Sequence, residues 1–386
     1  MKGKGKVYIK RAVSIAAMVL ALVLFVLFSQ EFFLARFDSN EIRVDGFYAE
    51  DKNSVDVVLI GASDLYSGYS PGIAYDKFGY TSYLFATGAN PISIYESQIK
   101  EVLAHQSPKM IVIEVNGALY KDSKKLYDTG NLHKYIDDMP YSLNKLQTIA
   151  QLIPFEKQSE FYIPFLKYHG IWSDYPSEKK EKCLTARWQL QSRGYSLLKG
   201  SNIIADIAKP AKDVKQDLSD DDSRLPLDPE SEEYFRNLLT YLKDNNINNV
   251  VFVRFPHHVD NKVYDRYQRT NRIGDIIKEY GYDFYNYERY MDKVGIDLNT
   301  DFGNSEHLNV YGNEKMTDCI GKLLTEEYGV TPSQLTDKQK EEWKNSVDYT
   351  KRYIEYVKEK TDSKSGEWIA EDSKTVAVLD SMPSQA

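Results

Sequence analysis

A serine and a distant histidine are the residues of this chain best placed to do chemistry together. Ser63 lies in the small-residue turn Gly61-Ala62-Ser63-Asp64, directly after the apolar run 55–60. His307 comes far downstream, in the segment Asn304-Ser305-Glu306-His307. A serine hydroxyl becomes a nucleophile when a base takes its proton, and histidine is the usual base. The pair therefore indicates nucleophilic attack on an ester carbonyl, with Ser63 carrying the acyl group as an intermediate.

Three further groups could hold the negative charge that develops on the attacked carbonyl oxygen. They are the backbone N–H groups of Ser63 and Gly88 and the side-chain amide of Asn116, and the latter two residues each follow an apolar run. Gly88 has no side chain, so its N–H can approach a substrate closely. Loss of one such donor typically slows acyl transfer by about 10²–10³. We therefore expect Ser63, Gly88 and Asn116 to form the oxyanion site.

Alternating strands and helices are predicted to bring these residues to one edge of a sheet. Apolar runs predict strands at 55–60, 80–86, 110–115, 249–255 and 282–287. Apolar residues at helical spacing predict helices beginning near 95 and 229, over 272–279 and after 307. This alternation is typical of an α/β fold with a parallel sheet. Ligands of such folds bind at the carboxyl ends of the strands, where Ser63 is expected.

Four short blocks, around Ser63, Gly88, Asn116 and His307, resemble those of the SGNH/GDSL hydrolase family. The resemblance spans roughly residues 55–324, with alanine at position 62 where the family's name motif has aspartate. It implies a flavodoxin-like, three-layer α/β/α fold with a mostly parallel sheet. It also implies catalysis through an acyl-serine, with no cofactor. The branch it most resembles is the membrane-anchored one near the D-alanylation protein of teichoic acid synthesis.

The third catalytic position departs from the family pattern. The family places aspartate three residues before the histidine, and this chain has Asn304 there. An amide cannot stabilise an imidazolium as a carboxylate does, and in serine proteases the aspartate-to-asparagine change costs about 10⁴ in turnover. Asn304 could still orient the His307 ring. Asp301 and Glu306 are nearby carboxylates that could substitute, although Glu306 adjoins the histidine.

Two functions are therefore expected as alternatives. The first is a serine esterase or O-acyltransferase that acts on acyl esters of a cell-surface glycan or teichoic-acid-like polymer. Hydrolysis and transfer need the same groups, so the sequence leaves the choice between them open. The second, motivated by Asn304, is a non-catalytic accessory protein that holds substrate beside an acyltransferase. Relatives in the resembling branch partner membrane-bound O-acyltransferases, which makes such an enzyme a candidate partner.

The N-terminus predicts a membrane anchor. Residues 1–11 are basic, and residues 12–34 form an apolar segment long enough to cross a bilayer as one helix. Basic flanks stay in the cytoplasm, so the main domain is expected outside the cell. A signal-peptide cleavage site does not follow the apolar run. We therefore expect a single-pass protein of the cell membrane with a cytoplasmic N-terminus.

The remaining chain is divided into a catalytic domain and a tail. The SGNH-like domain is expected over residues 46–330, with an inserted lid or wall at about 120–226 that is rich in aromatic residues and lacks a strand pattern. Residues 331–386 turn charged, and we expect an exposed helix followed by disorder from 363 onward.

Composition excludes other classes of function. The net charge of −8 and pI of about 5.5 argue against a nucleic-acid partner, whose phosphates would be repelled. Cys183 and Cys319 are too few for a disulfide framework, and whether they pair is left open. His257 and His258 are adjacent but lack an evident third ligand, so no metal site is predicted.

Overall fold

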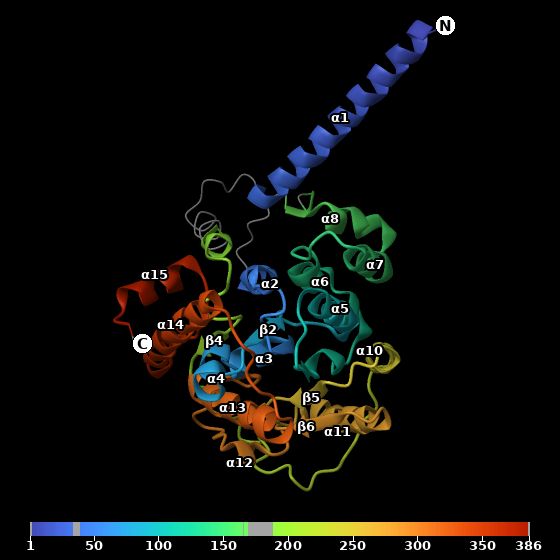
Figure 1. Cartoon of the computed structure of the whole chain (residues 1–386). Coiled ribbons are helices and arrows are strands. Elements are labelled where there is room, and N and C mark those ends of the chain that lie inside the picture. The colour runs from blue at the N-terminus through green and yellow to red at the C-terminus, as the bar shows by residue number, and fades with distance from the viewer. Residues whose placement is uncertain (1, 34–38, 165, 169–187, 385–386) are drawn as a thin grey trace.

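A five-stranded parallel sheet forms the centre of the molecule (Figure 1). The computed structural model describes residues 2–33, 39–164, 166–168 and 188–384 of the 386-residue chain. The strands lie in the order β2-β1-β3-β5-β6, and every neighbouring pair is parallel. Their bounds are β1 Val57–Gly61, β2 Ser82–Ala86, β3 Met110–Glu114, β5 Val250–Arg254 and β6 Asp283–Asn286. The predicted α/β class is confirmed.

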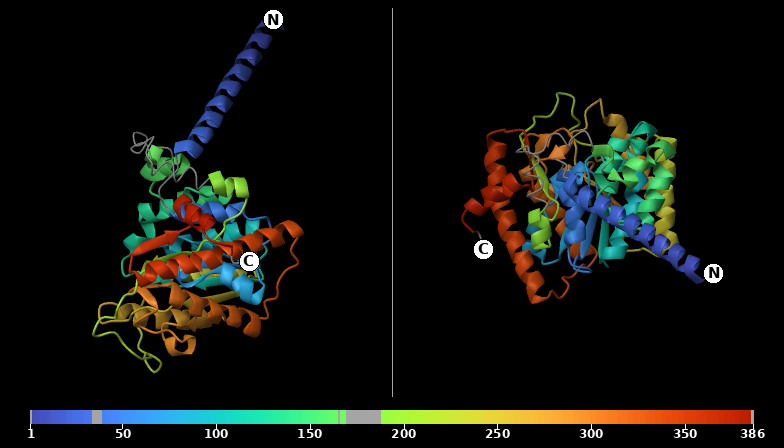
Figure 2. Two further views of the ribbon diagram at one scale, coloured as in Figure 1. Left: turned by 90° about the vertical axis from the view of Figure 1, so that its left-hand side faces the viewer. Right: turned by 90° about the horizontal axis from the view of Figure 1, so that it is seen from above.

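Helices cover both faces of this sheet, which gives three layers (Figure 2). Side chains alternate along β1: Val58 and Ile60 enter one core, and Val57 and Leu59 enter the other. The first core is closed by α2 Ser39–Ala49, α5 Tyr95–His105, α10 Pro229–Asp244 and α11 Tyr264–Glu279. The second is closed by α3 Ser63–Gly68, α4 Pro71–Phe78 and α13 Val310–Lys322. Because both faces are covered, the inner strands β1, β3 and β5 are apolar at nearly every position, whereas the edge strand β6 is only partly buried.

The strand register aligns the residues that follow three neighbouring strands. Gly61 at the end of β1 is paired with Ala86 at the end of β2. Ile60 is paired with Ile113, so Gly61 lies beside Glu114 at the end of β3. A Cβ on Gly61 would come within 2.8 Å of the Glu114 Cβ, so a larger residue does not fit here. Ser63, Gly88 and Asn116 each stand two residues beyond these aligned positions and therefore leave the sheet side by side.

A short hairpin follows the sheet and leads into α13. Strands β7 Phe302–Asn304 and β8 His307–Leu308 pair antiparallel, with Asn304 opposite His307. The backbone N–H of His258, which follows β5, donates to the Ser305 carbonyl in the hairpin turn at 2.9 Å. Asn309 then caps α13, its side chain accepting from the N–H groups of Tyr311 and Gly312. The hairpin is thus fixed at both ends.

The C-terminal segment is folded, which differs from the expected disorder after residue 363. Helix α14 Asp337–Asp362 leads to β9 Glu367–Ala370 and α15 Ser373–Ser381. Strand β9 pairs antiparallel with β4 Asn202–Ala205 to form a second, two-stranded sheet. The physical reason is a third apolar core, in which Tyr353 and Val357 of α14 pack with residues of β4, β9 and α15. The polar composition of the tail reflects only its outer face.

The region expected as an insertion, residues 120–226, is largely helical over 123–162, and it also contains strand β4, which differs from the expected lack of strands. It contains η3 Ser123–Tyr127, α6 Thr129–Ile136, α7 Leu143–Leu152, η4 Phe155–Lys157 and α8 Gln158–Tyr162, before β4. Leu132, Tyr135 and Ile149 join the first core, so this region packs on the main domain. Its role as a lid stays a prediction. Shorter elements elsewhere are η1 Ile92–Ile94, η2 Asn116–Ala118, α12 Met291–Val294 and η6 Leu323–Glu327.

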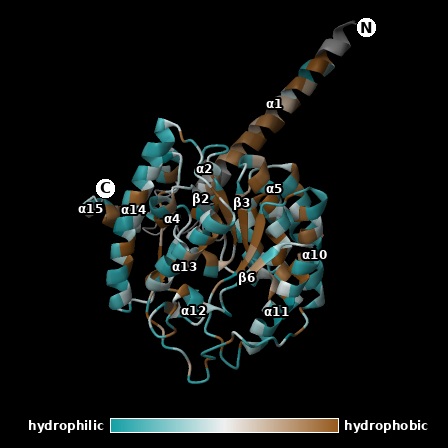
Figure 3. Cartoon of the chain, turned by 60° about the horizontal axis from the view of Figure 1, so that its bottom comes forward, coloured by the Kyte–Doolittle hydropathy of each residue, from teal (hydrophilic) through white to brown (hydrophobic). Residues whose placement is uncertain are grey.

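The N-terminal helix α1 Lys2–Phe33 projects away from the rest of the molecule (Figures 1 and 2). Its part from Val7 to Phe28 has a mean hydropathy of 2.5 and is not buried in the protein. Figure 3 shows apolar residues along its length. The helix is therefore long and apolar enough to cross a membrane, and signal sequences share these properties. The next helix, α2, begins at residue 39 and joins the first core, so the folded domain starts before the predicted residue 46.

Candidate active site

Ser63 occupies the turn between β1 and α3, as the sequence predicts. It is the first residue of α3 and is partly exposed. The first N–H groups of a helix have no acceptor within the helix, so the Ser63 N–H stays available at the sheet edge. This position follows β1, where the strand order reverses between β2 on one side and β3 on the other. Ligands of open α/β sheets bind at such a reversal.

His307 and Asn304 meet Ser63 in one chain of hydrogen bonds. The Nε2 atom of His307 lies 2.8 Å from Ser63 Oγ, and its Nδ1 atom lies 2.8 Å from Asn304 Oδ1. All three residues are partly exposed. The structure thus brings together the nucleophile, base and orienting group that the sequence predicts.

The partner of Asn304 fixes the tautomer of His307. The Glu306 backbone N–H also donates to Asn304 Oδ1, at 2.9 Å, so this atom must be the amide oxygen. An oxygen there can only accept from His307, which places the imidazole proton on Nδ1. The lone pair of Nε2 then faces the Ser63 hydroxyl. A neutral asparagine therefore sets the ring in the form that a general base requires.

Neither neighbouring carboxylate substitutes for Asn304. Asp301 is buried and pairs with Lys315 Nζ at 2.6 Å. Glu306 pairs with Arg266 Nη1 at 2.8 Å and is half-exposed. Both carboxylates are committed to other cations, and among the described residues neither forms a hydrogen bond with His307. The third position belongs to Asn304 alone.

The predicted oxyanion donors differ in their availability. The Oδ1 atom of Asn116 accepts from Arg254 Nη1 at 2.9 Å, which leaves the Nδ2 group as the donor end of that amide. Within the described residues, Asn116 Nδ2 donates to no protein acceptor. The Gly88 N–H, however, donates to Asn40 Oδ1 at 2.7 Å. The expectation that Gly88 offers a free donor is therefore not met here, because a side chain from α2 occupies it.

A cluster of buried charges lies beneath Ser63 and Asn116. Arg254, which is fully buried, contacts Asp64 Oδ2 at 3.3 Å, Glu114 Oε1 at 3.2 Å and Glu288 Oε1 at 3.2 Å. His257 lies 3.5 Å from Asp64 Oδ2 and 3.3 Å from Glu288 Oε1. Asp64 follows Ser63 directly, so one guanidinium group links the nucleophile turn to Asn116. Arg254 thereby fixes the spacing of two predicted site residues.

The carboxyl groups of this cluster differ in pKa. Burial opposes the ionisation of Asp64 and Glu288, but the facing His257 and Arg254 outweigh it and hold the pKa of each at about 2. Glu114 is the opposite case: burial and the charge of Asp64 raise its pKa well above the ordinary value. The cluster therefore keeps Asp64 and Glu288 ionised at neutral pH and favours the protonated form of Glu114. This limits the number of negative charges around Arg254.

Burial also controls the titration of His307. Desolvation lowers the pKa of His307 to about 4, against the opposing charge of Asp64. An ordinary histidine titrates near 6.5. The imidazole is therefore neutral at pH 7, as a proton acceptor must be.

Several groups at the site could not be assigned from the sequence pattern. Trp368 of β9 packs edge-on against the His307 ring, with ring centroids 4.9 Å apart. Tyr66 packs against Trp368 at 5.7 Å, and the Arg43 guanidinium lies over the Tyr66 ring at 3.9 Å. Lys134 of α6 donates to the Gly88 carbonyl at 3.1 Å. The sequence analysis missed all of these groups and Arg254 as well; for Arg254 the available signal is a charged residue that ends a buried strand.

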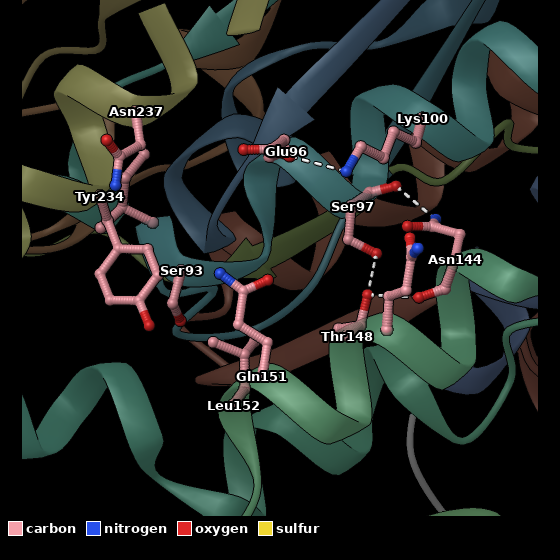
Figure 4. A pocket seen from close by; sticks show the side chains of 12 residues that line it. Ser93, Glu96, Ser97, Lys100, Asn144, Thr148, Gln151, Leu152, Tyr234 and Asn237 are labelled. Carbon is pink, nitrogen blue, oxygen red and sulfur yellow. Dashed lines mark hydrogen bonds and ion pairs between the residues drawn. The ribbon is translucent and has the colours of Figure 1, made fainter. Parts of the chain in front are cut away.

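Other candidate sites carry no matching chemistry. A pocket of about 350 Å³ lies among η1, α5, α7 and α10 (Figure 4). Its Glu96–Lys100 pair is 2.7 Å apart, and its lining includes neither histidine nor cysteine.

The adjacent histidines each contact a backbone carbonyl: His257 Nδ1 lies 2.7 Å from the Phe255 oxygen, and His258 Nε2 lies 2.9 Å from the Leu298 oxygen. Cys319 is half-buried on α13, and Cys183, the other cysteine whose pairing the sequence leaves open, lies outside the described residues.

The comparisons with known proteins leave the site to be interpreted from its own geometry. A scan against protein-family models and a search of curated proteins each found no match to this chain.

Proposed function

We propose that this protein is a membrane-anchored serine esterase or O-acyltransferase of the SGNH type. Its substrates would be acyl esters of a cell-surface glycan or a teichoic-acid-like polymer. The observation that carries the proposal is the hydrogen-bonded chain from Asn304 through His307 to Ser63, with both distances at 2.8 Å. These residues come from two ends of the chain, and a structural role alone does not require them to converge.

The fold supports the same proposal. The strands of the main sheet, taken in chain order, follow the 2-1-3-4-5 order of flavodoxin-like folds. The four blocks that resemble the SGNH family lie where that family would have them, after β1, β2 and β3 and just before α13. The apolar helix α1 supports an anchor, with the main domain placed outside the cell by the basic N-terminal flank.

The proposed reaction has two steps. Ser63 Oγ attacks the ester carbonyl while its proton passes to His307 Nε2, and the Ser63 N–H and Asn116 Nδ2 receive the oxyanion. When the C–O bond breaks, the same proton passes to the departing alcohol. Water or a sugar hydroxyl then attacks the acyl-Ser63, His307 again takes and returns the proton, and Ser63 is released. Water as acceptor gives an esterase, and a sugar hydroxyl gives a transferase.

The alternative is a non-catalytic accessory partner of a membrane-bound O-acyltransferase. Two observations favour it: a neutral Asn304 stands in the position of the family's aspartate, and Asn40 occupies the Gly88 N–H. Both would lower transition-state stabilisation. The same residues would then hold an ester without cleaving it.

Labelling by a fluorophosphonate separates the two functions. In full-length protein, Ser63 Oγ should form a bond to phosphorus as fluoride leaves, with the proton taken by His307. We expect labelling that Ser63→Ala and His307→Ala abolish. The matched control is Ser305→Ala, an exposed serine in the same hairpin, which should label like the wild type. Absence of labelling in the folded wild-type protein would instead support the accessory role.

A further inference from the structure

Trp368 is held in a defined place beside the imidazole of His307. Its strand, β9, pairs with β4, in a register that sets Trp368 opposite Ile204. The segment that follows β4 contacts the hairpin that carries His307: the Ala208 N–H donates to the Phe302 carbonyl at 2.8 Å. A Cβ on Gly303 of that hairpin would clash with the Ile204 side chain, so the two segments are in close contact. The position of the indole is thus built into the fold.

The indole is exposed at the edge of a partly exposed site. Trp368 is 39% exposed, whereas Trp343 of α14 is 3% exposed. Its ring packs at 81° to the His307 ring and at 71° to the Tyr66 ring, so its edges are partly covered. Single exposed aromatic residues are common on protein surfaces. This one differs because it contacts the ring that must move a proton.

The chemistry decides which part of a substrate meets this surface. His307 returns its proton to the oxygen of the departing alcohol, so that oxygen must come within hydrogen-bond reach of Nε2. The body of the alcohol must then lie against groups that surround the imidazole. The oxyanion donors, Ser63 N–H and Asn116, lie at the ends of β1 and β3 and face the carbonyl oxygen instead. Among the described residues, Trp368 is an exposed aromatic side chain in contact with the imidazole, and the body of the alcohol would meet it there.

We propose that Trp368 binds the sugar ring whose hydroxyl carries, or receives, the acyl group. This inference rests on the proposed function and adds a specificity-determining residue to it. A sugar ring presents C–H groups on its faces, which can cover the indole and remove apolar surface from water. Its hydroxyl groups remain free to reach His307 and solvent. Tyr66, held under the Arg43 guanidinium, supports the indole from one side.

The test compares two acetyl esters that differ only in the alcohol. The full-length protein is assayed on methyl 6-O-acetyl-glucopyranoside and on ethyl acetate, both acetates of primary alcohols. Trp368→Ala should lower kcat/KM for the sugar ester about ten-fold, mainly through KM, and change that for ethyl acetate less than two-fold. Trp368→Phe should restore much of the loss. Trp188→Ala, which removes another exposed tryptophan, should leave both esters unaffected.

The other possible results of this assay each contradict a different part of the proposal. An equal loss on both esters would show that Trp368 acts on His307 rather than on the alcohol. No loss on the sugar ester would show that the indole does not meet the sugar. If the wild type cleaves neither ester, the proposed function fails. A binding measurement then tests the role of Trp368 by itself. Methyl glucopyranoside should change the tryptophan emission of the Ser63→Ala variant but not that of the double variant Ser63→Ala with Trp368→Phe. Equal emission responses in the two variants would overturn the proposed role of Trp368.

Discussion

At the scale of single residues, Asn304 shows how an amide can organise a histidine without charging it. Its oxygen accepts from both the Glu306 N–H and His307 Nδ1, which fixes the imidazole tautomer. An aspartate at this position would fix the same tautomer and also stabilise the imidazolium. The amide therefore orients His307 but adds no negative charge that would raise the pKa of its imidazole.

The pH dependence of ester cleavage should reveal this. Because burial lowers the pKa of His307 to about 4, the base stays neutral, and kcat/KM stays level, from pH 7 down to about 5. Asn304→Asp should move the acidic limb to higher pH, since a carboxylate favours the protonated ring, and should raise the rate at pH 7. A wild-type limb near 6.5, the ordinary histidine value, would contradict the buried base.

Folding must be checked across the same range. The folded-state pKa of His307 lies below its unfolded value, so the unfolded chain binds this proton more readily. Stability should therefore decline as pH falls from about 6.5 through 4. Circular dichroism at each pH separates loss of the base from loss of the fold.

The oxyanion site gives a second prediction. Since Asn40 occupies the Gly88 N–H, the Ser63 N–H and the Asn116 amide would carry the developing charge in the proposed reaction. Asn116→Ala should lower kcat by about 10²–10³ with little change in KM. Asn237→Ala, in the separate pocket of Figure 4, should leave both constants unchanged. A loss confined to KM would assign Asn116 to substrate binding instead.

The sequence predicted some site residues and not others for a physical reason. Ser63, His307 and Asn304 follow recognisable strand ends or precede a helix, so local pattern locates them. Trp368 and Asn40 reach the site only through the pairing of β9 with β4 and the packing of α2 on β2. No local pattern encodes such contacts. Arg254 could have been found, because a charged residue that ends a buried strand requires buried partners.

At the scale of elements, the C-terminal segment depends on one tyrosine. Tyr353 of α14 is fully buried; its hydroxyl donates to the Ile369 carbonyl at 2.7 Å and accepts from the Ile203 N–H at 2.9 Å. It therefore joins α14 to both strands of the small sheet. Without it, a buried N–H and a buried carbonyl would each lose a partner.

Tyr353→Phe should lower the free energy of unfolding by about 1–3 kcal/mol, the usual cost of leaving buried polar groups unpaired. Urea denaturation measures the change. Tyr356→Phe is the matched control on the same helix, because among the described residues the Tyr356 hydroxyl forms no hydrogen bond. Equal stability of the two variants would show that the pairing with β4 and the apolar contacts of the third core hold β9 without the Tyr353 hydroxyl.

Elements were predictable where their burial is uniform. Strands β3 and β5 carry continuous apolar runs because both faces of the sheet are covered. Helix α11 was expected over 272–279 but begins at Tyr264, since Arg266, Arg269 and other polar residues fill its first turns. Strand β9 was missed because only Ile369 and Ala370 of its four residues are buried. A short, half-exposed strand has too little apolar pattern to be recognised.

At the scale of the whole molecule, we expect helix α1 and the folded domain to be separable. None of the apolar cores of the described residues contains a residue of α1. A chain that begins at Ser39 should therefore keep the melting temperature of the full-length protein and its labelling at Ser63. It should also remain in solution when membranes are pelleted, whereas the full-length protein should pellet with them.

A chain shortened only by residues 1–6 keeps the apolar span Val7–Phe28 and is the control, which should pellet. If the chain from Ser39 unfolds or still pellets, either α1 stabilises the domain or a second surface binds lipid. Sedimentation and thermal unfolding of the same samples distinguish these cases.

The contact between Asn40 and Gly88 has a consequence for the range of this protein. With α1 inserted as proposed, the backbone between Phe28 and Asn40 can extend at most about 40 Å. Ser63 would therefore stay close to the membrane, within a narrow layer above the lipid headgroups. Esters on the outermost reaches of a long surface polymer would never meet it. Only units still close to their point of synthesis, or folded back toward the bilayer, would be processed.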